Sequence, residues 1–135
     1  MTPHWATTLI GKPYVIGGEG PDKFDCWGLV RWCFINQFGI DMPRITIGGP
    51  TAADRAKAIR EVEDASGWRP CADSRPGDRD ILLMYGPSGR HVALALAVNG
   101  GVHVLHCIEE VGVTLTSFSE MWFLGFKDIT IWRKA

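Results

Sequence analysis

The sequence lacks an excess of charge of either sign, because its 135 residues carry 14 Lys and Arg against 15 Asp and Glu, for a formal net charge of −1. Its basic residues are spread along the chain and do not form the basic stretch that grips nucleic acid or an anionic membrane surface. No segment approaches the roughly 20 apolar residues that a helix needs to span a bilayer. We therefore expect neither a nucleic-acid partner nor a membrane span.

The start of the chain, MTPHWATTLIGKPY, also lacks the features of a secretory signal. It has no basic start, no apolar stretch of about 7 to 15 residues and no small-residue cleavage site. We therefore expect the chain to be made and folded in the cytoplasm. Cysteine is sparse and shows no CxxC spacing, which excludes a dense disulfide framework and predicts four reduced thiols. They are Cys26, Cys33, Cys71 and Cys107.

What is present fits one compact domain over residues 1–135, with 46% hydrophobic and 21% charged residues and a modest core. The first part of the chain predicts helices. A short helix is expected over 3–10, and an exposed helix over 51–64. Between them, apolar residues from Cys26 onward recur at spacings of three and four, which predicts a core helix that ends at Gly39.

The later part of the chain predicts strands. Five short runs typical of strands are separated by Gly, Pro and Asn: DILLMY, HVALALAV, VHVLHC, VTLT and FKDITIWR. Hairpins are the economical way to join them. The sequence therefore predicts an α+β fold in which N-terminal helices pack on a central antiparallel sheet.

Cys26 is the first candidate for chemistry, because it follows Asp25 and opens the predicted core helix. The unpaired N–H groups and the dipole at a helix start favour an anion, and they can lower a thiol pKa below its free value of about 8.5. The alternative is that Cys26 is one more small apolar side chain of the buried stripe, as free cysteines often are. Cys33, on the same stripe, is interpreted as a core residue.

Two histidines are candidates for the base that a cysteine nucleophile needs. The alternation in HVALALAV places His91 on one face with small alanines, which leaves room for a substrate. If Asn99–Gly100 forms a two-residue turn, His106 becomes a diagonal neighbour of His91, about 7 to 8 Å away between backbones. His103 then pairs with Leu96 and points to the other face. A register shift of one residue would reverse this arrangement.

Cys26, His91 and His106 together supply a nucleophile, a base and a group that orients the base, which is the logic of an acyl-transfer triad. The same three side chains could ligate zinc. Against a metal, the ligands are scattered, no second cysteine stands at a ligand spacing, and the fourth position would be open. We therefore expect no metal and no cofactor. Glu109 and Glu110 are interpreted as solvated turn charges.

Three segments of the sequence, in order, resemble a known family. They are GKPYVIGGEGPDKFDCWGLVRWCFINQFGIDMPR, RPGDRDILL, and RHVALALAVNGGVHVLHC with VGV after it. Their order and spacing are similar, over nearly the whole chain, to the NlpC-type cysteine peptidases and amidases that cut bacterial cell-wall peptides. In particular, the chain resembles the single-domain members encoded with phage tail genes and gene-transfer-agent clusters, where DCWGLV or a close variant replaces DCSGL. The resemblance implies a papain-like core.

The resemblance also implies roles for individual residues. Cys26 would be the nucleophile, His91 the base and His106 the polar third member. Tyr14 would line the site and help to form the oxyanion pocket with the backbone N–H of Cys26, although it could equally be a core aromatic. Asp25 would bind the free amine of a peptide stem, a role compatible with capping the helix.

Trp27 is a departure from the family pattern, since most secreted members carry serine there, beside the substrate groove. The resemblance therefore implies a narrowed or reshaped groove. It also implies a thiol hydrolase that cleaves amide bonds in peptidoglycan stem peptides, as part of a phage tail or phage-like particle, with tail or gene-transfer-agent proteins as partners. Two alternatives stay open: a structural or assembly component of a tail or injection apparatus with little hydrolysis, and an interbacterial amidase toxin.

Overall fold

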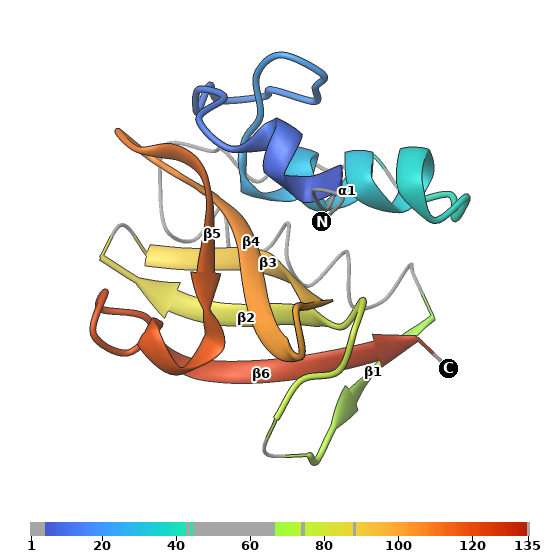
Figure 1. Cartoon of the computed structure of the whole chain (residues 1–135), viewed down its shortest axis with the longest axis vertical. Helices are drawn as coiled ribbons and strands as arrows, with labels where there is room; N and C mark the ends of the chain where they lie inside the picture. The colour runs from blue at the N-terminus through green and yellow to red at the C-terminus, as the bar shows by residue number, and fades with distance from the viewer. Residues whose placement is uncertain (1–4, 43, 45–66, 74, 88, 135) are drawn as a thin grey trace.

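A six-stranded sheet forms the centre of the computed structural model, which describes residues 5–42, 44, 67–73, 75–87 and 89–134 (Figure 1). All of its strand pairs are antiparallel, and the spatial order is β1-β6-β2-β3-β4-β5. The strands are β1 (Trp68–Cys71), β2 (Ile81–Gly86), β3 (Gly89–Val98), β4 (Gly101–Ile108), β5 (Gly112–Ser117) and β6 (Lys127–Lys134). The predicted central antiparallel sheet is confirmed.

The described residues contain one α-helix, α1 (Cys26–Gln37), and the short 3-10 helices η1 (Trp5–Leu9) and η2 (Phe118–Glu120). The expected core helix is therefore confirmed, with its end at Gln37. The helix expected over 3–10 is instead a 3-10 turn. Its shortness has a local cause, because the Thr8 hydroxyl donates a hydrogen bond of 2.7 Å to the Trp5 carbonyl and competes for that acceptor. The helix expected over 51–64 lies outside the described residues.

The helix α1 packs on one face of the sheet, against β3 and β4 (Figure 1). Its buried stripe, which includes Leu29, Cys33 and Phe34, joins one apolar cluster with Leu94 and Leu96 of β3. Leu94 and Leu96 alternate with the alanines of β3 and lie on the face opposite to them. Because α1 is seated on β3 and β4, its N-terminal end is held against the sheet that carries the histidines.

The opposite face of the sheet is covered by a second apolar cluster. Ala93 and Ala95 are fully buried in it, in the same cluster as Met84, Met121 and Phe126. The expectation that the alanines keep this face clear is therefore wrong over most of its length. The small side chains make room for a packed layer of the protein itself, and a pocket lies at the end of the face near His91.

The β3–β4 hairpin has the predicted register. Val98 pairs with Gly101 and Leu96 with His103. The turn residues between the strands, Asn99 and Gly100, have φ angles of 51° and 80°, the positive values that a type I′ turn requires. The register that would bring His91 and His106 to one face is confirmed.

Two features of the sheet go beyond the predicted hairpins. Strand β1 is an additional edge strand, and β6 lies between β1 and β2. β1 contains Pro70, which is tolerated at an edge but weakens the strand pattern in the sequence. β6 is tied to the turn before β2, because Arg133 donates hydrogen bonds of 2.9 and 2.8 Å to the buried carboxylate of Asp80.

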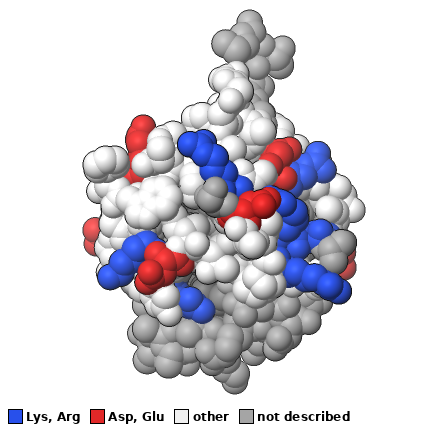
Figure 2. Space-filling view, turned by 90° about the horizontal axis from the view of Figure 1, so that it is seen from below, with Lys and Arg blue, Asp and Glu red and all other residues white. Residues whose placement is uncertain are grey.

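None of the helices in the described part of the chain is long and apolar enough to cross a membrane. Figure 2 shows Lys and Arg interspersed with Asp and Glu over the face seen from below, in line with the balanced charge of the sequence.

Candidate active site

Asp25 holds the start of α1 in place. Its carboxylate accepts a hydrogen bond of 2.6 Å from the Gly28 N–H and one of 3.2 Å from the Gly17 N–H. The side chain is only 3% exposed, and burial raises its pKa although both backbone donors lower it. The predicted capping role is confirmed. Both oxygens are engaged by the backbone, so Asp25 fixes the loop at Gly17 to the first turn of the helix.

Gly28 permits a close contact between that loop and the helix. A Cβ atom added at residue 28 would overlap the carbonyl oxygen of Gly18, a contact that no side chain could make. The same carbonyl accepts a hydrogen bond of 2.9 Å from the Asp25 N–H. The absence of a side chain at Gly28 therefore lets the backbone on both sides of Cys26 form one rigid corner.

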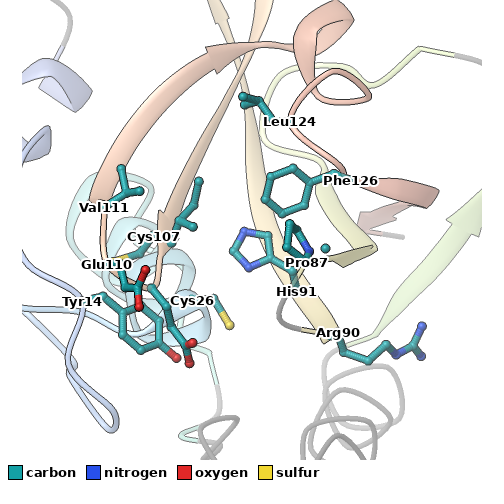
Figure 3. Close-up of a pocket in the computed structure, with 14 residues that line it drawn as sticks. Tyr14, Cys26, Pro87, Arg90, His91, Cys107, Glu110, Val111, Leu124 and Phe126 are labelled. Carbon is teal, nitrogen blue, oxygen red and sulfur yellow. The ribbon is translucent and has the colours of Figure 1, made fainter.

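Cys26 lies at this corner and lines a pocket of about 310 Å³ (Figure 3). Its side chain is 4% exposed. Burial raises the pKa of the thiol to about 12, and the Asp25 charge adds to this, while the backbone N–H groups of Val92 and Trp27 act in the opposite direction. Burial therefore opposes the effect of the helix start on this thiol, and the expected acidity of Cys26 stays a prediction.

His91 and His106 meet at the same end of the sheet. His91 Nε2 lies 3.1 Å from His106 Nδ1, and His106 Nε2 lies 3.2 Å from the hydroxyl of Thr116 on β5. Thr116 is not among the site residues predicted from the sequence. The alternation in VTLT, on the strand next to His106, could have indicated that a threonine faces His106. The result is a continuous hydrogen-bonded row from the pocket into the core.

Burial sets the charge state of both imidazoles. It lowers the pKa of His91 to about 3, with a further contribution from His106, and it lowers the pKa of His106 to about 4. Both rings also contact Phe126, at centroid distances of 5.1 and 5.3 Å. At neutral pH the two histidines are therefore neutral, and each can donate from one ring nitrogen and accept at the other.

The hydrogen bonds restrict the tautomers. If His91 is to accept a proton at Nδ1, its Nε2–H must donate to His106 Nδ1, and the Nε2–H of His106 must then donate to Thr116. This assignment satisfies every contact in the row. It leaves the Nδ1 lone pair of His91 available on the pocket side.

Tyr14 and two glutamates complete the polar lining of the pocket. Tyr14 is joined to Phe24 by a β-bridge, which brings it beside Cys26. Burial raises the pKa of its hydroxyl, and the charges of Cys26, Asp25 and Glu109 add to this, so Tyr14 remains a hydrogen-bond donor. Glu109 and Glu110 are exposed, as expected of turn charges, but they also line the pocket.

Trp27 does not reach this pocket. Its side chain is 1% exposed and belongs to the core cluster, and the residue lines a smaller pocket together with Asp25 and Arg31. The position after Cys26 is rotated by about 100° around the helix, which directs the indole inward. Trp27 is therefore absent from the lining of the pocket at Cys26, and the expected effect of its indole on the shape of a substrate groove stays a prediction. Among the described residues, no group of three His, Cys, Asp or Glu side chains could hold a metal ion.

The family model and the similar proteins that match this chain point to the same family. The sequence model of the NlpC/P60 family matches residues 11–126. The chain is 53% identical over 82 residues to "Probable endopeptidase Rv2190c" of Mycobacterium tuberculosis, covering 59% of this chain and 17% of that protein. It is 27% identical over 113 residues to "Murein DD-endopeptidase MepS/Murein LD-carboxypeptidase" of Escherichia coli, covering 84% of this chain and 51% of that protein. The chain thus spans about a sixth to a half of these relatives.

A solved structure agrees with the sequence matches. The crystal structure of the NlpC/p60 domain of peptidoglycan hydrolase SagA has a TM-score of 0.54 and 30% identity, and the match covers 93% of this chain and 91% of that chain. The structure of NlpC2 from Trichomonas vaginalis has a TM-score of 0.62 at 23% identity, covering 96% of this chain and 44% of that chain, and it supports the fold alone.

Proposed function

The chain belongs to the NlpC/P60 family, and on that premise we propose that it is a thiol hydrolase that cleaves amide bonds in peptidoglycan stem peptides. The relatives are named as endopeptidases and a peptidoglycan hydrolase, which supports this substrate class. One structural observation carries the proposal: the pocket that contains the Cys26 thiol also contains His91, which is hydrogen-bonded to the buried His106. Nucleophile and base therefore line one ligand-sized space, and the orienting group is hydrogen-bonded to the base outside the lining of that space.

In the proposed first step, Nδ1 of His91 accepts the thiol proton while the Cys26 sulfur attacks the carbonyl carbon of the scissile amide. The carbonyl π pair moves to oxygen and forms an oxyanion. The backbone N–H of Cys26 and the hydroxyl of Tyr14 are the proposed donors to this oxygen, and the raised pKa of Tyr14 keeps its proton in place for that role.

In the second step, the oxyanion pair returns to carbon, the C–N bond breaks, and the imidazolium of His91 gives its proton to the leaving amine. The acyl group remains on Cys26 as a thioester. A water molecule then attacks the thioester carbonyl and gives a proton to His91. The thiolate leaves and takes that proton back, which releases the carboxylic acid and restores the neutral pair.

The burial of the pair favours proton transfer that accompanies attack over a resting ion pair. Burial raises the thiol pKa and lowers the imidazole pKa, which favours the neutral form of both groups before substrate binds. When His91 becomes cationic, both of its nitrogens donate, and neutral His106 can still accept at Nδ1. His106 therefore orients the base and stabilises its charged form without itself transferring a proton.

Soluble stem peptides, with cleavage followed by mass spectrometry, test the proposal. We expect Cys26→Ser and His91→Ala each to lower kcat by about 10⁴-fold or more, because members of one catalytic unit fail together. His106→Ala should cost less, about 10² to 10³-fold. His103→Ala is the control, since His103 pairs with Leu96 and lies on the other face of β4. Full turnover by the Cys26→Ser variant would refute the proposal.

We propose further that the chain acts as part of a phage tail or phage-like particle, together with tail or gene-transfer-agent proteins. The support is the resemblance of the segment around DCWGLV to members encoded with such genes. Mass spectrometry of purified particles should detect the chain in fixed proportion to tail proteins. A particle that assembles normally with the Cys26→Ser chain but fails to degrade peptidoglycan would favour the enzyme over the purely structural alternative. A chain found in a neighbouring cell and absent from particles would favour the toxin.

A further inference from the structure

Arg90 brings a positive charge to the pocket that contains Cys26. It lies near the start of β3, directly before His91, and both residues line the pocket. A guanidinium keeps its charge in proteins, because its pKa lies far above neutral pH. The Cζ atom of Arg90 lies 4.8 Å from the centroid of the Tyr85 ring, which supports the cation from one side. A permanent cation is thus held at one end of the ligand space.

No residue in the described part of the chain neutralises this cation. None of the ion pairs found there includes Arg90, and its buried Nε has no hydrogen-bond partner. By contrast, Arg31 and Arg133 are paired with Glu19 and Asp80. An arginine without an acceptor beside a pocket is available to an anionic ligand, and a carboxylate matches the parallel N–H donors of a guanidinium.

The acidic residues of the pocket lie at its other end. Figure 3 shows Glu110 on one side of Cys26 and Arg90 on the other. Glu109 and Glu110 are exposed residues between β4 and β5, both line the pocket, and neither forms an ion pair with a described residue. An anionic group of a ligand is therefore repelled at this turn and attracted at Arg90.

The proposed reaction places the leaving half of the peptide at the same end as Arg90. The leaving amine takes its proton from His91, so the leaving half extends from Cys26 past His91. Arg90 precedes His91 in β3, and its guanidinium is directed away from Cys26 in Figure 3. It therefore meets a group beyond the scissile bond, on the leaving half, and not the oxyanion.

We propose that Arg90 binds a carboxylate on the leaving half of the peptide, and thereby selects stems in which that half carries a free acid. This inference rests on the proposed function, because it needs the catalytic pocket to be the peptide site. The contact is the same in the bound peptide and in the transition state, so its loss should appear mainly as a higher KM. Because Arg90 is only partly buried, salt should weaken the contact.

Two peptides that differ only in a free or an amidated carboxylate at the end of the leaving half test the inference. We expect the intact protein to cleave the free-acid peptide with the higher kcat/KM, and the ratio of the two values to fall about tenfold in Arg90→Gln. Arg90→Lys, which keeps the charge but loses the two-pronged contact, should give an intermediate ratio. Arg79→Gln is the matched control and should leave the ratio unchanged, because Arg79 also stacks on an aromatic ring, that of Phe38, but does not line this pocket.

Calorimetric binding of the same two peptides to the Cys26→Ala protein separates this inference from the proposed function. A preference for the free acid that disappears when Arg90→Gln is added supports the inference even if neither peptide is cleaved, a result that would overturn only the proposed function. A preference that persists in Arg90→Gln, or that is absent when Arg90 is present, overturns the inference. The melting temperature shows whether each variant is folded. If Arg90→Gln is unfolded at the assay temperature, an unchanged ratio in Arg90→Lys overturns the inference.

Discussion

Removal of the Asp25 carboxylate should lower the free energy of unfolding, because two backbone N–H groups lose their acceptor. In Asp25→Ala the helix loses its cap, at about 1 kcal/mol, and the Gly17 N–H loses its acceptor in a partly buried site, at about 1 to 2 kcal/mol. The unfolding free energy should therefore fall by about 2 to 3 kcal/mol. For a domain of this size that corresponds to about 10 °C in melting temperature.

Asp25→Asn should cost less, because the amide oxygen can still accept from Gly28 while its NH₂ group cannot accept from Gly17. A loss of about 1 kcal/mol, or roughly 4 °C, is expected. Thermal denaturation followed by circular dichroism measures both values, with Asp22→Asn as a control for an aspartate whose side chain is 90% exposed. The capping account would be refuted if Asp25→Ala kept the melting temperature of the unaltered protein.

Three further predictions follow from the site. In the unfolded chain the imidazoles bind protons below about pH 6.5, whereas burial in the folded protein lowers the pKa of His91 to about 3 and that of His106 to about 4. Because the unfolded state then binds more protons, the unfolding free energy should fall as pH drops from about 6.5 to 4. Urea titrations at several pH values measure the unfolding free energy as a function of pH. In His106→Asn, the slope of that free energy against pH should be lower by up to about 1.4 kcal/mol per pH unit. Gly28→Ala should lose about 1 to 3 kcal/mol of unfolding free energy by overlap with the loop, whereas Gly101→Ala, whose Cβ would make only an ordinary van der Waals contact of 3.8 Å with the His103 ring, should be nearly neutral in the same assay. Thr116→Val should lower kcat about fivefold at unchanged KM, and Thr116→Ser should restore it; equal kcat in all three proteins would exclude Thr116 from the row.

The sequence could predict the histidine pair because its position depends on local rules. Strand alternation assigns His91 to a face, and the Asn99–Gly100 turn fixes the register that brings His106 to the same face. Both rules act over a few residues and were confirmed. Position at the start of a helix likewise allowed Asp25 to be predicted as a cap.

The sequence could not predict features that depend on three-dimensional packing. The apolar stripe left open whether Cys26 is buried or reactive, and the structure shows a thiol that is both buried and part of the pocket lining, where burial acts against the helix start on its pKa. Trp27 turns into the core because α1 is seated on β3 and β4, whereas the family pattern alone suggested a groove. The position of β6 between β1 and β2 requires a long-range pairing that alternation does not encode.

Covalent labelling with an electrophilic stem peptide tests the central claim most directly. The peptide carries a thiol-reactive ketone in place of the scissile amide, and modified residues are mapped by mass spectrometry. The account predicts one label per chain, on Cys26, with loss of labelling in His91→Ala; Cys33 on the same helix and Cys107 in the same pocket should stay unmodified. Labelling of Cys33 or Cys107 at the rate of Cys26, or labelling of Cys26 that is independent of His91, would contradict the account.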